Sequence, residues 1–413
     1  MNIVICIPNK YGHYLDAKIG FMSVYNDLDK SIKHYPIDLT DVENVELPKI
    51  STNSVVVNKR LFDTHYKSIE SYDLETQAWL GGESVDLDVI NFRKYLKHYR
   101  RLDYYRYVPY YVYVAMSEKL IHTILNCKNL LVISKASDFY TNVIYPSIET
   151  IERNCMYVKL DSFNNNFNRN YTNNFVKVLY NIHTKTGRPS NVYDGVNYSA
   201  INKKDDSRLN FISRFDSGYL VEYDFDSYHI RIIGKLLNYD FSDIESLHTY
   251  FAKMYFNTDT ITESQYEDSK KISFTLLYKD DKDLCDRYNI DFFNKVYSLK
   301  EKIWEQYQNI GYVDSPITQR KLSVSDEMNK SKLFSYYIQM IETELSMLFI
   351  HGVNTYLYNK KSKMILYTYD SILIDYNIED GYDLLKDLKK ILINSKVKKG
   401  KNYKDMELFS IVC

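Results

Sequence analysis

The chain has 413 residues and is 45% hydrophobic, so it is long enough for about two to four domains with sizeable cores. Its formal net charge of −1 excludes a protein that binds nucleic acid through overall basic charge, although a local positive groove stays compatible with it. The five cysteines lie far apart in the sequence, which argues against a zinc knuckle and against a disulfide framework.

The amino-terminal segment MNIVICIPNKYGHYL lacks the basic start and the long apolar centre of a signal peptide. No apolar run in the sequence reaches the length that is needed to cross a bilayer. We therefore expect a cytoplasmic protein without membrane contact, located in the host cytoplasm if its source is a virus.

The first half of the chain contains short elements with weak signals. Apolar runs predict strands at residues 2–7 and 54–58, and the pattern becomes helical over residues 88–130. Residues 143–163 predict a helix followed by a short turn, and the polar residues 164–174 predict a loop or an exposed helix end.

The second half has clearer periodicity. YLVEYDF (219–225) predicts a strand, and two short apolar runs around Asp370 predict a hairpin over 363–376 with this acid at its tip. Helices are predicted over residues 227–238, 264–280 and 332–350.

Asp224 ends an apolar strand, where a buried carboxylate is costly unless it is paired or binds a metal. Taken alone, such an acid is most often a helix N-cap, and an acid at a hairpin tip such as Asp370 is most often a turn residue. Lys270, Phe274 and Tyr278 are four residues apart and share one helix face, which is ordinarily a core stripe with a lysine that reaches to solvent. Together, however, two carboxylates on adjacent strands and a lysine on a facing helix match two-metal phosphoryl transfer.

Eight segments of the second half resemble the motifs of family A DNA polymerases, the DNA polymerase I type, and they occur in the family's order. DFDSYHIR (224–231) is similar to motif A, KKISFTLLY (270–278) to motif B and YTYDSILI (367–374) to motif C. The other matching segments are TKTGRPSN (184–191), ESLHTYFA (245–252), GYVDSPITQRKL (311–322), YIQMIETE (337–344) and GKNY (400–403). The chain is thus similar to a reduced, phage-like member of this family.

The resemblance implies an α+β fold shaped like a right hand, with an antiparallel palm sheet, helical fingers, a reduced thumb and an N-terminal degenerate 3′–5′ exonuclease-like α/β domain. The implied domains are an exonuclease-like domain at 1–135, a reduced thumb at 136–190, a first palm part at 191–250, fingers at 251–344 and a second palm part at 345–413. Because only a stub of a thumb fits between Asp161 and Thr184, we expect poor processivity without a partner subunit.

The resemblance also implies template-directed addition of dNTPs to a primer 3′-OH, with two Mg²⁺ ions as cofactors. Asp224, Asp370 and the main-chain carbonyl of Phe225 would hold the ions, and Lys270 would act with them in catalysis. Asp226 is expected to cap the following helix rather than to tune the metal site. The residues implied to bind the incoming nucleotide are Phe274, Tyr278, His248 and His229, and those implied to bind DNA are Arg188, Arg320 and Gln339. The expected partners are primer–template DNA, dNTPs and a processivity or exonuclease subunit.

Several residues depart from the family pattern. His229 stands where the family has a glutamate that helps to exclude a ribose 2′-OH, and Tyr266 stands where an arginine contacts the triphosphate. Tyr369 and Ser371 flank Asp370 in place of a histidine and a glutamate. These departures keep two alternatives open: a non-catalytic polymerase-like replication subunit that binds DNA or a partner, and a single-subunit RNA polymerase or reverse transcriptase.

The first half resembles the exonuclease domain more faintly, over residues 55–96. YDLET (72–76) matches the D-x-E-T pattern of metal-binding acids through Asp73 and Glu75. However, the preceding HYKSIES predicts no buried strand, and the first predicted strand, where that motif belongs, carries no acid. Because metal-nuclease chemistry needs its full set of carboxylates, we expect a retained scaffold without nuclease activity.

Overall fold

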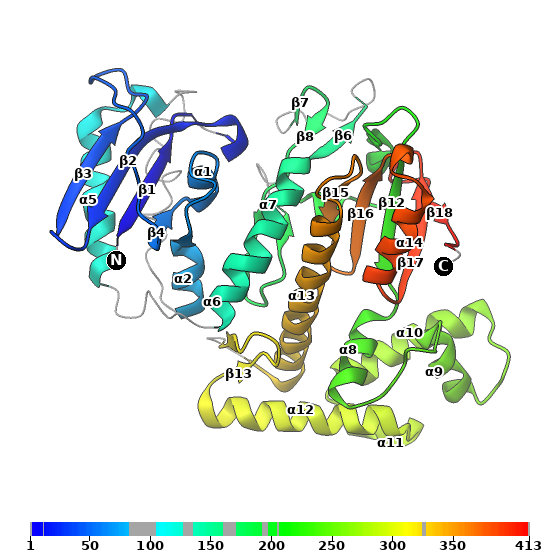
Figure 1. Cartoon of the computed structure of the whole chain (residues 1–413). Coiled ribbons are helices and arrows are strands. Elements are labelled where there is room, and N and C mark those ends of the chain that lie inside the picture. The colour runs from blue at the N-terminus through cyan, green and yellow to red at the C-terminus, as the bar shows by residue number, and fades with distance from the viewer. Residues whose placement is uncertain are drawn as a thin grey trace. The chain divides into compact units, whose positions relative to one another are not determined.

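The computed structural model of the chain (Figure 1) describes residues 2–10, 12–81, 105–126, 135–159, 171–191, 197–204, 206–323 and 328–411. The chain divides into two compact units, Met1–Tyr145 and Pro146–Cys413. Parts of two sequence predictions, the helical pattern at 88–130 and the polar segment at 164–174, lie outside the described residues.

A five-stranded mixed sheet forms the centre of the first unit (Figure 1). Its strand order is β3-β2-β1-β4-β5, in which β1, β2 and β3 are antiparallel neighbours while β4 and β5 run parallel to β1. The strands are β1 (Ile3–Pro8), β2 (Ile19–Asn26), β3 (Ser31–Pro36), β4 (Ser54–Val57) and β5 (Ser71–Asp73). The α-helices are α1 (Lys59–Asp63), α2 (Leu74–Gly81), α5 (Tyr110–Asn126) and α6 (Lys135–Phe139).

Strand β1 is buried along almost its whole length, because it lies in the middle of the sheet. Its residues Ile3, Ile5 and Ile7 belong to one core with Leu120 and Ile121 of α5. Such continuous apolar runs are typical of strands that are covered on both faces. The two strands predicted from apolar runs are therefore confirmed as β1 and β4, and the strands β2 and β3 were not predicted.

The prediction that no buried strand leads into YDLET needs correction. Residues 65–70 contain no strand, but β5 begins at Ser71 and pairs in parallel with β4, so Asp73 ends a buried strand. Its Oδ2 atom accepts hydrogen bonds from the main-chain N of Thr76 at 3.0 Å and from the Thr76 hydroxyl at 2.7 Å. Asp73 thus caps the start of α2, which is the common role of an acid at this place.

A five-stranded antiparallel sheet is the centre of the second unit (Figure 1). Its order is β15-β16-β12-β17-β18, so β12 lies between β16 and β17. The strands are β12 (Tyr219–Phe225), β15 (Lys363–Tyr367), β16 (Ser371–Tyr376), β17 (Ser395–Gly400) and β18 (Glu407–Leu408). The predicted strand at 219–225 is confirmed, and so is the hairpin at 363–376 with Asp370 in its turn.

Smaller sheets and helices complete this unit. The small strands are β6 (Met156–Val158), β7 (Tyr171–Thr172), β8 (Phe175–Val176) and β11 (Phe211–Ile212) in one sheet, and the pairs β9 (Tyr180–Asn181) with β10 (Ser190–Asn191) and β13 (Val313–Asp314) with β14 (Lys321–Leu322). The α-helices are α7 (Tyr145–Asn154), α8 (Tyr228–Leu236), α9 (Leu247–Phe256), α10 (Glu263–Tyr278), α11 (Lys282–Tyr288), α12 (Asp291–Ile310), α13 (Lys330–Tyr356) and α14 (Tyr382–Ile391). All three helices predicted in the second half are confirmed as α8, α10 and α13.

Two predictions near α7 are corrected by the structure. The helix predicted from 143–163 ends at Asn154, and the left-handed Cys155 (φ 55°) leads into strand β6 rather than into a turn. The polar segment 164–174 was predicted as a loop or an exposed helix end. In its described part, Tyr171–Thr172 instead forms strand β7, which pairs with β8. Both elements are short and gain stability from cross-strand pairing, which local sequence does not report.

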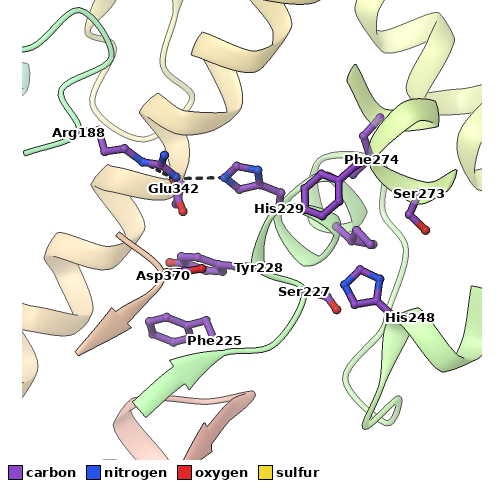
Figure 2. Close-up of a pocket in the computed structure, with 12 residues that line it drawn as sticks. Arg188, Phe225, Ser227, Tyr228, His229, His248, Ser273, Phe274, Glu342 and Asp370 are labelled. Atoms are coloured by element: carbon purple, nitrogen blue, oxygen red, sulfur yellow. Dashed lines mark hydrogen bonds and ion pairs between the residues drawn. The ribbon is translucent and has the colours of Figure 1, made fainter. Parts of the chain in front are cut away.

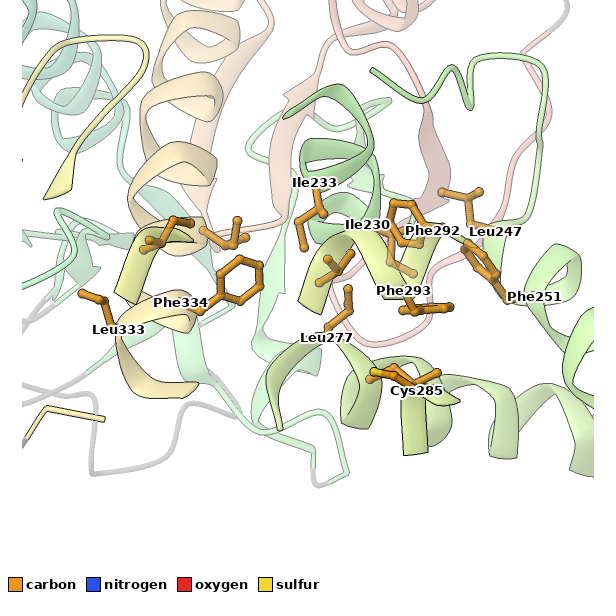
Figure 3. Close-up of a cluster of buried hydrophobic side chains, with 14 of the residues drawn as sticks. Ile230, Ile233, Leu247, Phe251, Leu277, Cys285, Phe292, Phe293, Leu333 and Phe334 are labelled. Carbon is orange, nitrogen blue, oxygen red and sulfur yellow. The ribbon is translucent and has the colours of Figure 1, made fainter. Parts of the chain in front are cut away.

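The helices α8 to α13 are held together by one hydrophobic cluster, which contains several aromatic rings (Figure 3). Phe251 of α9 packs against Phe292 and Phe293 of α12, with ring centroids 5.5 Å and 4.9 Å apart. Leu277 of α10 and Phe334 of α13 belong to the same core. Because α8 follows β12 directly and α10 shares this core, one packed cluster sets the place of α10 relative to the end of β12.

Candidate active site

Two acids lie at neighbouring strand ends of the antiparallel sheet. Asp224 of β12 pairs in register with Ser371 of β16, and the main-chain N of Phe225 donates to the main-chain O of Asp370 at 2.8 Å. The turn that carries Asp370 contains Tyr369 in a left-handed conformation (φ 68°), and Ser227, next to Asp226 after β12, has φ 51°. Strained backbone of this kind in non-glycine residues is often found at functional sites.

The two carboxylates are not electrically independent. Protein atoms crowd the carboxyl group of Asp370, and this desolvation, followed by the negative charges of Asp224 and Glu342, raises the pKa of Asp370. Carboxylates that disfavour each other's charge in this way form a donor set that a divalent cation stabilises. Among the described residues, no group of three or more His, Cys, Asp and Glu side chains could hold a metal ion. Asp224 and Asp370 nevertheless offer carboxylate oxygens at neighbouring strand ends, the donor chemistry that fits Mg²⁺, which takes its remaining ligands from water and from substrate phosphates. The part of the Phe225 carbonyl stays a prediction.

A pocket of about 210 Å³ opens beside Asp370 (Figure 2). It is lined by Arg188, Phe225, Ser227, Tyr228, His229, Ile230, His248, Ser273, Phe274, Leu277, Glu342 and Asp370. The lining residues come from the sheet end, from the start of α8, from α9, α10 and α13, and, for Arg188, from the segment between β9 and β10. The structure thus brings together six of the residues implied by the resemblance: Arg188, Phe225, His229, His248, Phe274 and Asp370.

Glu342 is a residue of the pocket that sequence reasoning missed. It lies on α13, is only 1% exposed, and accepts a hydrogen bond from Nε of Arg188 at 3.1 Å (Figure 2). Nε2 of His229 lies 3.2 Å from the same carboxylate. Burial raises the pKa of Glu342, but the contacts with His229 and Arg188 outweigh it, so that the pKa lies below its usual value. The signal was present in the sequence, because an acid inside the apolar run of a predicted helix needs a partner.

His229 connects this carboxylate to α10. Its Nδ1 atom is hydrogen bonded to the hydroxyl of Tyr278, while its other ring nitrogen faces Glu342. Arg188 lies over the ring of Tyr369 with its guanidinium carbon 4.5 Å from the ring centroid. Position 229, where the family that the sequence resembles has a glutamate, thus carries a histidine, and the buried carboxylate of Glu342 contacts this histidine from another helix.

The predicted face of α10 is only partly turned toward the pocket. Phe274 is 52% exposed and lines the pocket, and its ring is stacked at 6.2 Å from that of Tyr278. Lys270 does not line it: its ammonium pairs with Glu267 at 2.7 Å and lies 4.3 Å from the ring centroid of Tyr266. The catalytic role of Lys270 stays a prediction, since its side chain would need to leave Glu267.

His248 lines the pocket from α9 and is 9% exposed. Burial, as the largest cause, lowers the pKa of His248. Its Nδ1 atom is buried, and no described residue of the chain hydrogen bonds to it. A neutral imidazole has one ring nitrogen that accepts a hydrogen bond and one that donates, so His248 could bind a polar ligand in either way.

The structure places Arg320 and Gln339 away from the pocket lining. Arg320 is 5% exposed, donates to the main-chain O of Thr186 at 2.6 Å and lies 3.6 Å from the carboxylate of Glu344. Its guanidinium thereby ties the TKTGR segment to α13. Gln339 donates to the hydroxyl of Ser335 at 3.1 Å and is half-buried. Their contacts with DNA stay predictions.

The expected role of Asp226 as a helix cap is wrong. The N-cap residue of α8 is Ser227, and its side chain makes no capping hydrogen bond. The side chain of Asp226 instead contacts Lys396 at 2.6 Å and Arg231 at 3.7 Å. Two lysines of β17, Lys396 and Lys398, were also missed by sequence reasoning, because their place beside the acids depends on strand register.

The chain is similar in structure to the POL domain of Pol1 from M. smegmatis, whose structure is a complex with DNA primer-template and dNTP. The TM-score is 0.68, and the match covers 98% of this chain and 95% of that one at 13% sequence identity. The chain has the fold of a DNA polymerase domain. The predicted α+β polymerase architecture is confirmed at this level.

Comparisons at the sequence level find less. No protein-family model matches the chain. No curated protein matches it either. Within the described residues, none of the helices combines the length and the apolar character that crossing a membrane requires.

Proposed function

We propose that the chain is a template-directed DNA polymerase of family A, a reduced and phage-like member, that adds dNTPs to a primer 3′-OH by two-metal nucleotidyl transfer. One observation carries the proposal: Asp224 and Asp370 lie at paired strand ends, and Asp370 lines a pocket together with Phe274 and two histidines, within a polymerase-domain fold. The partners would be primer–template DNA and dNTPs. The reaction would take place in the cytoplasm, or in the cytoplasm of the host cell if the chain comes from a virus.

The domains follow from this proposal. The sheet of β12 and β15–β18 would be the palm, spanning parts of 191–250 and 345–413, and the helices within 251–344 would be the fingers. Residues 136–190 would be a reduced thumb, which leaves a role for a separate processivity subunit. Residues 1–135 would be a degenerate exonuclease-like domain, and this is supported by the acid-free central strand β1 and by the capping role of Asp73.

Two Mg²⁺ ions, when bound, would activate the primer hydroxyl and stabilise the charge on the leaving pyrophosphate. Asp224, Asp370 and the Phe225 carbonyl would hold them. The hydroxyl oxygen forms a bond to the α-phosphorus, the bond from this phosphorus to the bridging oxygen breaks, and pyrophosphate leaves. The hydroxyl proton passes to water.

The chain's own residues would bind and orient the substrates. Lys270, after leaving Glu267, and His248 would balance the triphosphate charge, while Phe274 and Tyr278 would pack against the nascent base pair. Arg188 and Gln339 would contact the primer–template through its backbone and minor-groove edge, where readout is degenerate and suits a sequence-blind enzyme. Arg320 would support this contact through the TKTGR segment that it holds.

A second function, a non-catalytic polymerase-like replication subunit, is compatible with one specific observation. The ammonium of Lys398 lies 2.8 Å from the Asp224 carboxylate, so an internal cation stands beside a proposed metal ligand. A scaffold protein would tolerate such a pair permanently, whereas a polymerase must release it.

Primer extension distinguishes these functions. Purified chain, a labelled primer on a DNA template, Mg²⁺ and dNTPs should yield extended primer, and rNTPs alone should yield much less. Extension with rNTPs at the dNTP rate would favour an RNA polymerase, and extension on an RNA template alone would favour a reverse transcriptase. Binding of the primer–template without any extension would favour the scaffold.

A further inference from the structure

Three acids and two lysines face each other across β12 and β17. Glu222, Asp224 and Asp226 alternate along β12 and its end, so their side chains lie on one face of the sheet. In the antiparallel register, Lys398 is opposite Glu222 and Lys396 is opposite Asp224. The acids that include a proposed metal ligand thus lie directly beside a row of cations.

The two lysines form ion pairs with different acids. The ammonium of Lys398 lies 3.0 Å from the Glu222 carboxylate and 2.8 Å from the Asp224 carboxylate. The ammonium of Lys396 lies 2.6 Å from Asp226. Lys398 therefore contacts Asp224 itself, whereas the ionic partner of Lys396 is Asp226.

The two carboxylates that share Lys398 differ in burial. The Glu222 side chain is 7% exposed, and it also lies near the hydroxyls of Ser371 at 3.4 Å and Tyr403 at 3.5 Å. The Asp224 side chain is 34% exposed, so an ion from solution can reach it. Glu222 is thus a permanent partner for the lysine, and Asp224 is a partner that it can lose.

We propose that Lys398 competes with the divalent metal for Asp224, and that Glu222 retains the ammonium after Asp224 has been released to the metal. This inference rests on the proposed function, because that function makes Asp224 a metal ligand. The physical reason is that an ammonium on one oxygen of a carboxylate repels a dication at the same group. In the metal-free chain Lys398 neutralises Asp224, which weakens the repulsion between Asp224 and Asp370. Lys398 is then a positioning residue that sets how much Mg²⁺ the site requires.

Mn²⁺ binding tests this competition without any need for turnover. Free Mn²⁺ is measured by its EPR signal while the whole chain is titrated, and Asp224→Asn identifies which sites depend on Asp224. Lys398→Met should tighten binding at the Asp224-dependent site about fivefold, as expected for the loss of one partly exposed ion pair. The matched control is Lys396→Met, which removes a lysine from the same strand face and should change the dissociation constant less than about twofold, because its partner is Asp226.

Glu222→Gln should have the opposite effect. Without the Glu222 charge, Lys398 has only Asp224 as an ionic partner, so Mn²⁺ must compete against a firmer pair and binding should weaken about two- to threefold. The double variant Lys398→Met/Glu222→Gln should return to the tight binding of Lys398→Met. This double variant also leaves no buried unpaired charge, so it gives the answer if Lys398→Met alone does not fold.

The outcomes separate this inference from the proposed function. Mn²⁺ binding that Lys398→Met and the double variant leave unchanged or weaken would overturn the competition, even if the wild type extends primers. Equal tightening by Lys396→Met would overturn it too, because general charge would then explain the effect. Tightening that is specific to Lys398 in a chain that extends no primer would support the competition and reject the polymerase. Absence of any Asp224-dependent Mn²⁺ binding would overturn the inference.

Discussion

Each unit of the molecule is built on a five-stranded sheet, and the central strands of the two sheets differ in chemistry. Strand β1 (Ile3–Pro8) is apolar throughout and almost fully buried, whereas β12 (Tyr219–Phe225) carries Glu222 and Asp224 among apolar residues. The acid that ends a strand of the first sheet, Asp73, is used to cap a helix. The comparison teaches that the middle strand of a five-stranded sheet can be wholly apolar or can carry the charges that the proposed metal chemistry needs.

The largest effect is expected at the two acids of the second sheet. Asp224→Asn and Asp370→Asn should each reduce primer extension about a thousandfold, because metal-bound carboxylates supply several kcal/mol of transition-state stabilisation. DNA binding should stay nearly unchanged, since contacts with phosphates dominate affinity. Rapid-quench extension assays and filter binding measure the two quantities.

The control for these variants is Asp383→Asn. Asp383 lies on α14 with its side chain 89% exposed, and it pairs only loosely with Lys386. This variant should keep normal extension. Near-normal turnover in either Asp224→Asn or Asp370→Asn would contradict the proposal that the acids of the second sheet bind the catalytic metal ions.

The buried carboxylate of Glu342 should contribute strongly to the stability of the second unit. Glu342→Ala leaves Arg188 and His229 without their shared partner, and we expect a loss of about 2 kcal/mol, below the range for fully buried pairs because Arg188 is 25% exposed. Urea unfolding can be followed by Trp304 fluorescence in a Trp79→Phe background, so that only the second unit is reported.

Glu342→Gln is the matched variant, because its amide can still accept a hydrogen bond from Arg188. It should lose less than half as much unfolding free energy as Glu342→Ala. Equal losses, or a loss below about 0.5 kcal/mol in Glu342→Ala, would show that the charge contributes little.

His229 should take part in sugar selection. We expect dNTPs to be preferred by the wild type, and His229→Ala to lower the dNTP-over-rNTP ratio of kcat/KM about tenfold, because the ring that connects Tyr278 to Glu342 is removed. Single-nucleotide incorporation with dATP and ATP measures this ratio. His351→Ala, an exposed histidine on α13, is the control. An unchanged ratio in His229→Ala would exclude this histidine from selection.

The first unit should have no nuclease activity. A labelled single strand should stay intact with Mg²⁺ or Mn²⁺, and Asp73→Ala should only cost about 1 kcal/mol of stability through the lost cap. Trp79, on the helix that Asp73 caps, reports this loss in a Trp304→Phe background. Degradation that disappears in Asp73→Ala or Glu75→Ala would show that the first sheet carries metal chemistry after all.

The smallest effect concerns stability at the active site. The folded-state pKa of Asp370 lies above its ordinary value, so ionisation of this group costs folding free energy at every pH above that pKa. Asp370→Asn should therefore raise the melting temperature at pH 7.5, on the order of 1 °C, because the residue keeps contact with solvent although protein atoms crowd its carboxyl group. The gain should vanish as the pH falls below the ordinary aspartate range, about 3.9. A lower melting temperature of Asp370→Asn than of the wild type at pH 7.5 would show that the ionised Asp370 carboxylate does not destabilise the fold.

Local patterns allowed much of the second unit to be predicted. The bounds of β12, the hairpin around Asp370 and the helix α10 follow from short-range periodicity and turn residues. Strands β2 and β3, the short strand β6 and the strand β5 before Asp73 did not follow, because they depend on partners elsewhere in the sheet.

In the candidate site, too, some residues could be predicted from local sequence and others could not. Asp224 and Asp370 could be found because each interrupts an apolar pattern at the end of a strand. Glu342 and Lys398 could not be placed, since the first reaches His229 from α13 and the second reaches Asp224 through the register of β17. Pairing between distant segments decides which charges meet, and a single sequence does not contain that information directly.

The most direct test of the central claim is the anomalous signal of Mn²⁺ in crystals of the chain with a dideoxy-terminated primer–template and a dNTP. Two peaks about 3.5–4 Å apart should lie between the carboxylates of Asp224 and Asp370, with none at the sheet of the first unit. Peaks at Asp73, or none between Asp224 and Asp370 in a complex that contains the nucleotide, would contradict the claim that the second sheet alone carries the metal chemistry.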